Sequence, residues 1–316
     1  MRIGKLLLGI LMIGFITTSC SSDPYINDGA PAITLEELLT SYDLWYVNIN
    51  DTQGSGEVPF LQTAFTLSFD YGLLMANNNL VGFGSTGNGL GINTGTYATY
   101  GSILEVDHDL DGFMQLEVIQ HQQNYIEIYD SYTNTSYFLT GYQRQNFDYD
   151  YVFYENIEYF LQEYEAWEKT FTSNYGALNE FDEENFLTFI PEGYGDTFLS
   201  SVDPPSGTSV NNVVWDYEGI YGVYDVAGDP YLKTLTLDYD YMGNDYFELV
   251  VINDNKIELY HPDSGTVYEF TGRGYIQYLK GAENNDTKNS RKRTKVEREE
   301  MNIERQSPRG RPIVSR

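Results

Sequence analysis

Short apolar runs alternate with turn-forming clusters through most of the chain. The runs are rich in Tyr, Val, Ile, Thr and Phe, and clusters of Gly, Asn and Asp separate them, which is typical of β-strands joined by tight turns. Residues 126–129 (IEIY) and 257–260 (IELY) alternate apolar with polar positions, as strands buried on one face do. The pair Asp254-Asn255 divides two such runs and predicts a hairpin over residues 246–260. The pattern therefore predicts a mainly β protein.

The order of these runs is repeated once, about 125 residues further along the chain. Short stretches match in pairs: 42–45 with 164–167, 65–72 with 186–193, 95–97 with 219–221, 104–109 with 235–240, 113–119 with 246–252 and 126–129 with 257–260. The period exceeds the roughly 20–50 residues of solenoid repeats, so it indicates two copies of one domain. We expect tandem antiparallel β-meanders or barrels at residues 33–147 and 152–280.

Each copy is predicted to open with a short helix. In the first copy, Thr34 is a suitable N-cap residue, and Glu37 three positions later completes the pattern of a capping box. Apolar residues recur at helical spacing after it: Leu35, Leu38 and Leu39. In the second copy the corresponding set is Ile157, Phe160, Leu161, Tyr164 and Trp167.

The first 20 residues have the layout of a secretory signal. A short basic start precedes an apolar run over residues 6–16, and small residues then lead to Cys20, the one cysteine of the chain. The run is too short to cross a bilayer, which takes about 20 apolar residues. This layout resembles the signal of bacterial lipoproteins, although Thr17 stands where that family usually has Leu or Val.

The resemblance implies that Cys20 is lipidated, that residues 1–20 are a removed signal peptide, and that residues 21–32 are a linker. It implies a cell envelope location in a Gram-negative bacterium, with a lipid anchor in the outer membrane on its periplasmic or surface face. The alternative is an ordinary signal peptide with a chance cysteine.

Charge is distributed unevenly along the chain. The formal net charge is −29, yet residues 281–316 carry ten Lys and Arg against six acidic residues, whereas residues 21–280 carry six against 41. So acidic a body repels nucleic acid, because proteins bind it largely through Lys and Arg at the phosphates. It would attract cations or basic partners. Residues 281–316 lack apolar periodicity and contain two prolines, which predicts a disordered basic tail.

The order of motifs resembles the lipocalin-like domains of bacterial surface lipoproteins. The first copy has an early Trp45, then Phe65 and Phe69 followed by residues 70–72 (DYG), and G-T-Y at 95–97. The second copy offers Trp167, residues 186–193 and residues 219–221. The usual G-x-W is replaced by Y-D-L-W and Y-E-A-W, and Pro191 stands where an Asp is expected. The resemblance implies barrels of about eight strands, filled by side chains or holding one small ligand.

One stretch has the start of a calcium-binding loop. Asp107, Asp109 and Asp111 alternate ahead of Gly112, a spacing that lets carboxylates converge on the ion while glycine permits a sharp turn. The twelfth position is Val118 instead of Glu, and the flanking runs are strands instead of helices. We therefore interpret the stretch as a hairpin turn and keep calcium at the three aspartates as the alternative.

Other motifs are too incomplete to predict a catalytic site. Residues 82–87 match G-x-G-x-x-G, but the sequence N-G-L-G that follows cannot open the helix that a phosphate site needs. The spacing of His108, His121 and His261 forms no metal pair. A Ser-His-Asp triad stays open because it is recognised by geometry, and so do paired carboxylates of a glycosidase.

Aromatic residues are abundant, with 29 tyrosines and three tryptophans. A tyrosine offers a flat apolar face with a polar tip, which suits sugars and protein surfaces. We interpret most of the tyrosines as residues of the β-core, and Trp45, Trp167 and Trp215 as core anchors.

Proteins resembling this chain also carry the name nicotinic acid mononucleotide adenylyltransferase. That family uses an H-x-G-H element on a nucleotide-binding α/β fold, and no histidine here has a partner three residues away. We expect instead a binding or structural protein without a cofactor, for a small apolar ligand, a glycan or an envelope protein. A polysaccharide hydrolase is the first alternative, and a nucleotidyltransferase is the less favoured one.

Overall fold

The computed structural model describes residues 33–81, 90–190, 196–205, 207–241, 243–277 and 291–303. The predicted signal peptide with Cys20, the linker 21–32, the glycine-rich motif at 82–87 and Pro191 lie outside the described residues. Within those residues, no helix combines the length and the apolar character that crossing a membrane requires.

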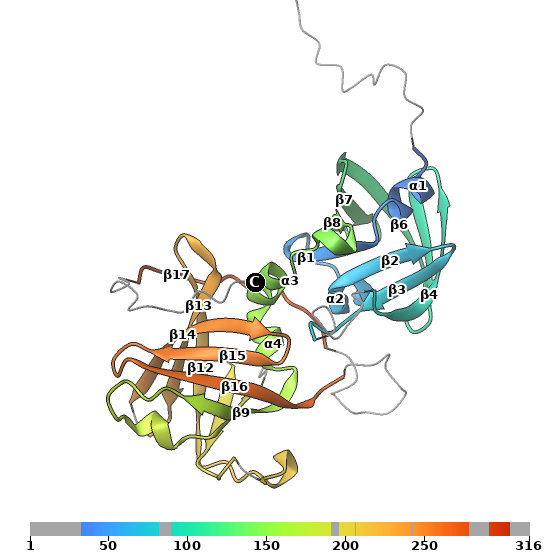
Figure 1. The fold of residues 1–316 in the computed structure, drawn as a ribbon. Helices are drawn as coiled ribbons and strands as arrows, with labels where there is room; N and C mark the ends of the chain where they lie inside the picture. Colours follow the sequence, from blue (N-terminus) through green and yellow to red (C-terminus); the bar gives the residue numbers. More distant parts are fainter. Residues whose placement is uncertain are drawn as a thin grey trace, which may run out of the picture. The chain divides into compact units, whose positions relative to one another are not determined.

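The first copy is a closed barrel of eight antiparallel strands in chain order, here called barrel 1 (Figure 1). Its strands are β1 (Leu44–Gln53), β2 (Thr66–Asp70), β3 (Leu73–Asn77), β4 (Ile92–Tyr100), β5 (Ile103–His108), β6 (Gly112–Gln122), β7 (Tyr125–Asp130) and β8 (Thr135–Tyr142). Pairing of β1 with β8 closes the barrel. Helix α1 (Leu35–Thr40) precedes β1, α2 (Pro59–Thr63) connects β1 to β2, and the 3₁₀-helix η1 (Arg144–Asn146) follows β8.

The second copy repeats this meander as barrel 2. Its strands are β9 (Tyr164–Thr172), β10 (Phe186–Ile190), β11 (Thr197–Ser201), β12 (Tyr217–Val226), β13 (Asp229–Tyr239), β14 (Asn244–Asn253), β15 (Lys256–His261) and β16 (Thr266–Tyr275). Pairing of β16 with β9 closes the barrel, and β11 pairs with β12. The 3₁₀-helices η2 (Glu180–Glu183) and η3 (Val210–Asn212) lie before β10 and before β12. The prediction of two tandem antiparallel β domains is thus confirmed.

The two barrels repeat the same contacts around their first tryptophan. The indole N–H of Trp45 donates to the carbonyl of Leu39 at 2.9 Å, and that of Trp167 donates to the carbonyl of Leu161 at 2.8 Å. A tyrosine three residues earlier packs edge-on against each indole, with ring centroids 5.0 and 4.8 Å apart. The repeat seen in the sequence is therefore also a repeat of hydrogen bonds and packing.

Both barrels are filled by their own side chains. Fully or almost fully buried residues of barrel 1 include Trp45, Val47, Leu67, Leu74, Leu104, Val106, Leu116, Ile126, Ile128, Tyr137 and Leu139. Those of barrel 2 include Trp167, Leu187, Leu235, Leu237, Phe247, Leu249, Ile257, Leu259, Tyr268 and Phe270. An eight-stranded barrel is just wide enough for its side chains to fill it. The lipocalin-like resemblance implies an interior that is either filled by side chains or able to hold one small ligand. The filled interior is observed.

The helices at the start of each copy agree with the prediction only in part. In α1 the Thr34 side chain accepts from the Glu37 backbone and the Glu37 side chain accepts from the Thr34 backbone, which confirms the capping box. The second helix is wrong in extent, because α3 (Tyr149–Glu155) and α4 (Ile157–Leu161) end before Tyr164. Tyr164 and Trp167 belong to β9, where pairing with β16 overrides their helical spacing.

The predicted disordered tail is also wrong in part. Residues 291–303 are ordered by contacts with other parts of the chain, and Arg293 is only 1% exposed. The two-residue strand β17 (Glu300–Met301) pairs in parallel with Asp225 and Val226 of β12. The sequence pattern misses this order because polar contacts, instead of an apolar stripe, hold the segment in place.

Candidate functional site

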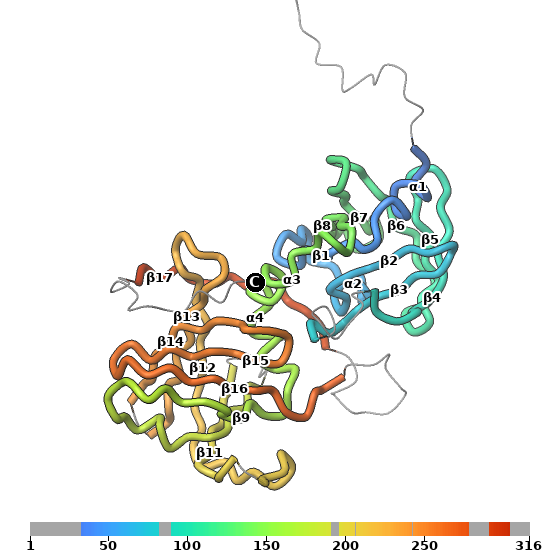
Figure 2. Tube along the Cα trace, viewed as in Figure 1, coloured from blue at the N-terminus to red at the C-terminus, as the bar shows by residue number. Residues whose placement is uncertain are grey.

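The loop between β11 and β12, residues 202–216, is tied together by two aspartates and is the yellow segment next to β11 in Figure 2. The Val202 amide donates to Asp216 Oδ2 at 2.9 Å, and the Val214 amide donates to Asp203 Oδ2 at 2.8 Å. These two bonds join the ends of the loop and favour one conformation. Residues of the loop line two surface grooves.

The first of these grooves, here called the aromatic groove, has a volume of about 430 Å³. Its lining residues are Leu199, Trp215, Asp216, Tyr217, Glu218, Tyr239 and Tyr241. Tyr241 is 93% exposed, Tyr217 is 37% exposed, and Trp215 is half-buried. The interpretation of Trp215 as a core anchor is therefore wrong, because the indole forms a wall of a surface groove.

Tyr239 joins the aromatic groove to a buried polar network. Its hydroxyl donates to both carboxylate oxygens of Glu184 at 2.8 Å. Burial raises the pKa of Glu184 to about 7. Lys169 lies in the same network, where its ammonium donates to the carbonyl of Asp182 at 2.7 Å and burial lowers its pKa to about 8. Glu184 is only 3% exposed, so it fixes Tyr239 in place and does not present an acid to the groove.

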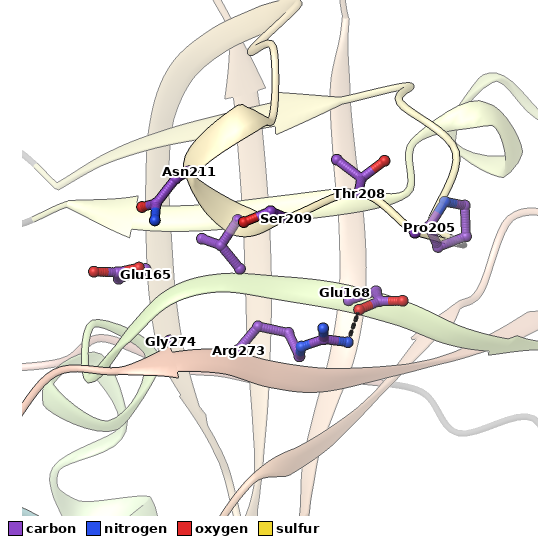
Figure 3. Close-up of a pocket in the computed structure, with 10 residues that line it drawn as sticks. Glu165, Glu168, Pro205, Thr208, Ser209, Asn211, Arg273 and Gly274 are labelled. Atoms are coloured by element: carbon purple, nitrogen blue, oxygen red, sulfur yellow. Dashed lines mark hydrogen bonds and ion pairs between the residues drawn. The ribbon is translucent and has the colours of Figure 1, made fainter.

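The second groove, here called the polar groove, has a volume of about 610 Å³ (Figure 3). Strands β9 and β16 contribute Glu165, Glu168, Arg273 and Gly274, and the loop contributes Pro205, Gly207, Thr208, Ser209, Val210 and Asn211. Figure 3 shows the loop side chains across from the strands that carry Glu165 and Arg273. The Arg273 guanidinium forms an ion pair with Glu168. The groove therefore offers hydroxyl, amide and carboxylate groups to a polar ligand.

The three aspartates of the calcium hypothesis lie in or beside the β5–β6 hairpin. Asp107 is on β5, and Asp109 and Asp111 are exposed in the turn. Asp111 Oδ2 lies 3.0 Å from Nδ1 of the buried His108. Among the described residues, no three His, Cys, Asp or Glu side chains are grouped as a metal site would need. The positions of the three aspartates agree with a hairpin turn, and calcium binding stays the untested alternative.

A serine, a histidine and an aspartate meet at the β15–β16 turn. His261 Nδ1 lies 2.8 Å from Ser264 Oγ, and His261 Nε2 lies 3.6 Å from Asp245 Oδ1. The Ser264 hydroxyl donates to Thr266 Oγ1, so its proton points away from the imidazole. A catalytic triad needs that proton on the serine–histidine bond.

The duplication explains this arrangement as a turn cap. Asp130 lies at the position of barrel 1 that corresponds to His261, and its side chain accepts from Thr133 three residues later. His261 contacts Ser264 at the same spacing. The geometry therefore supports a structural role for this histidine.

No protein-family model matches the sequence, and neither does any curated protein. The class of protein is defined by the fold alone, as two tandem eight-stranded antiparallel barrels with surface grooves on the second.

Proposed function

We propose that this is a lipid-anchored, non-enzymatic envelope protein that binds a glycan at the loop 202–216 of barrel 2. The observation that carries the proposal is the aromatic groove, in which one tryptophan and three tyrosines line a surface hollow together with two carboxylates. Aromatic rings with polar tips stack on the apolar faces of sugars, while carboxylates accept hydrogen bonds from sugar hydroxyls.

The size of both grooves agrees with this function. Small-molecule sites have volumes of roughly 300–1,000 Å³, and the two grooves measure about 430 and 610 Å³. A small apolar ligand would need a hollow interior, whereas side chains fill both barrels. Hydrolysis is less supported, because Asp216 accepts from the Val202 amide and Glu184 is buried behind Tyr239.

The anchor and the location rest on the sequence. Lipidation of Cys20 would hold the protein at the outer membrane of a Gram-negative bacterium, where the extracellular and periplasmic polysaccharides are. Binding needs no cofactor in this proposal.

Glycan binding is tested with residues 21–316, which contain the whole unit from Thr34 to Arg316. Fragments of envelope polysaccharides are titrated by calorimetry against the wild type and against Trp215→Ala and Tyr241→Ala. We expect each substitution to weaken binding at least tenfold, which corresponds to about 1.4 kcal/mol. Tyr132→Ala is the matched control, since Tyr132 is 95% exposed in a hairpin turn of barrel 1 and Tyr241 is 93% exposed in one of barrel 2.

The proposal fails if none of the fragments binds. It also fails if a bound fragment is indifferent to both Trp215 and Tyr241, or if Tyr132→Ala weakens binding as much as Tyr241→Ala does.

A further inference from the structure

The basic segment 291–298 occupies a cleft that is separate from both grooves. The Arg293 amide donates to the carbonyl of Gln62 in α2 at 2.6 Å. The Thr294 amide donates to the hydroxyl of Tyr159 in α4 at 2.6 Å, and the Val296 amide donates to Asn50 Oδ1 in β1 at 2.9 Å. Elements of β1, α2 and α4 therefore bind the extended segment through its backbone.

The centre of the cleft is a cage for one guanidinium. The Arg293 guanidinium donates to the carbonyl of Val47 at 3.2 Å, to the carbonyl of Ala64 at 2.6 Å and to Asn156 Oδ1 at 3.0 Å. The charged group lies 4.2 Å from the ring centroid of Phe65. Ring faces stabilise a cation by their quadrupole, and carbonyl oxygens accept its N–H groups.

The cage is held in shape by its own hydrogen bonds. Asn156 is 2% exposed, and its amide donates to the Tyr46 hydroxyl and to the Val152 carbonyl, both at 2.9 Å. All the hydrogen-bond acceptors that hold the Arg293 guanidinium are neutral. Both terminal nitrogens of the Arg293 guanidinium find acceptors, whereas its buried Nε has none among the described residues. The cage therefore fits the forked end of an arginine side chain.

The rim of the cleft is acidic and aromatic. Glu158 receives two hydrogen bonds from the Arg298 guanidinium, at 2.7 and 2.6 Å. Lys292 forms an ion pair with Glu57. The Arg291 guanidinium lies 4.0 Å from the ring centroid of Tyr159. The rim therefore selects a segment that carries several positive charges, with the second anchoring arginine five residues after the first.

We propose that this cleft is a recognition site for an extended basic segment of a partner protein, and that residues 291–298 occupy it as an intramolecular competitor. The segment shows the chemistry of the ligand, with one arginine in the cage and a second at Glu158. Because the segment belongs to the same chain, it competes as an intramolecular ligand. A second copy of the chain offers the same sequence without the tether, so it gains nothing over the resident segment, whereas a partner with additional contacts can displace it.

The test uses residues 21–316 with Arg293→Ala and Arg298→Ala, two substitutions in the segment that change none of the residues forming the cleft. A fluorescent peptide of residues 289–299 is titrated against this variant and against the wild type, and binding is followed by fluorescence anisotropy. We expect the peptide to bind the variant at least tenfold more tightly than the wild type, whose cleft is occupied. A peptide carrying Arg293→Lys is expected to lose at least tenfold, because an ammonium cannot form the fork of hydrogen bonds in the cage. Equal binding to both proteins, or indifference to the lysine, would overturn the proposal.

Hydrogen exchange of the wild type provides a second measurement that does not depend on folding of the variant. We expect the Thr294 and Val296 amides to exchange much faster than the core amides of β1, because the segment leaves the cleft without unfolding of barrel 1. Exchange of these amides only with global unfolding would contradict the proposal. A dimer in native mass spectrometry that is lost on Arg293→Ala would assign the cleft to a second copy and would overturn the choice of a partner protein.

Discussion

The two barrels share their backbone hydrogen bonds but differ in the chemistry at one end. The Val47 amide donates to the carbonyl before Thr66 at 2.9 Å, and the Lys169 amide donates to the carbonyl before Phe186 at 2.8 Å, so Val47 and Lys169 occupy equivalent positions. By the same pairing, Glu184 corresponds to the buried Ala64. The sequence match of residues 65–72 with 186–193 is therefore wrong by one residue, because Leu67 faces Trp45 as Leu187 faces Trp167.

The third equivalent pair is His108 and Tyr239, which face Gly95 and Gly219 on the neighbouring strands. Barrel 1 thus has two apolar residues and a histidine where barrel 2 buries a lysine, a glutamate and a tyrosine that lines the aromatic groove. The tryptophan contacts are the same in both barrels, whereas the residues at these three equivalent positions differ. The fold therefore depends on the tryptophan contacts and tolerates substitution at the three positions. The network behind Tyr239 is the feature that distinguishes the barrel with the candidate site.

The largest expected effect tests whether the two cores are equivalent. Trp45→Ala and Trp167→Ala should each reduce the free energy of unfolding by about 3–5 kcal/mol, because each empties a fully buried position. Trp215→Ala should change it by less than about 0.5 kcal/mol, since this indole lines a surface groove. Equilibrium denaturation measures all three. If Trp45→Ala or Trp167→Ala lowers the free energy of unfolding as little as Trp215→Ala does, the two cores are not equivalent.

The next effect is a pH dependence of the free energy of unfolding. It arises from two buried carboxyl groups, Glu184 of barrel 2 and Glu163, the residue before β9. Burial raises the pKa of Glu163 to about 8 and that of Glu184 to about 7. The folded state therefore binds more protons than the unfolded state, and stability is lost as the pH rises from about 4.5 through these values. Lys169, whose pKa is lowered to about 8, is protonated in both states over most of this window.

We expect the melting temperature to fall between pH 5 and pH 8, with a cost on the order of 1–3 kcal/mol for each carboxyl. Glu163→Gln and Glu184→Gln should each flatten the profile, and the exposed Glu218→Gln is the control that leaves its slope unchanged. A melting temperature that rises over this range would contradict the assignment.

A smaller effect distinguishes the glycines that face the first tyrosine of each barrel. A Cβ at Gly272 would lie 2.6 Å from the ring of Tyr164, which is buried and bonded to the Asp254 carbonyl. A Cβ at Gly141 would lie 2.7 Å from Tyr42, which is only half-buried and can move. Gly272→Ala should cost about 1–3 kcal/mol, and Gly141→Ala should cost less. Thermal melts of the two variants compare them, and equal costs would show that Tyr42 is held as firmly as Tyr164.

The smallest effect concerns calcium and the two equivalent hairpins. Asp107, Asp109 and Asp111 have only two counterparts in barrel 2, Asp238 and Asp240. Because the described aspartates form no cluster of three ligands, millimolar calcium should shift the melting temperature by less than about 1 °C. A larger rise that disappears in Asp109→Asn would establish a site in the first hairpin.

The sequence predicts the repeated elements well because they depend on local patterns. Alternation in IEIY and IELY gives strands, and Thr34 with Glu37 gives the capping box. The misinterpreted residues depend on contacts between distant segments. Trp215 looks like Trp45 in the sequence, and only the path of the loop 202–216 leaves it at the surface.

The order of the C-terminal segment was equally hidden from the sequence. Arg293 is one of ten basic residues after position 280, and its acceptors lie more than 130 residues away along the chain. One feature of the sequence points to the network of Lys169 and Glu184. When the two copies are compared position by position, these charged residues replace the apolar Val47 and Ala64.

Side chains fill both barrels, and the proposed ligand site lies outside them, on barrel 2. The three tryptophans allow one direct measurement, because Trp45 and Trp167 are buried in the two cores and Trp215 lines the aromatic groove. Fluorine NMR of residues 21–316 labelled with 5-fluorotryptophan would follow all three during addition of envelope polysaccharide fragments and of a fatty acid. We predict that a glycan shifts the Trp215 resonance alone and that the fatty acid shifts none. A shift of Trp45 or Trp167 on addition of the fatty acid, with Trp215 unmoved by every glycan, would contradict the account.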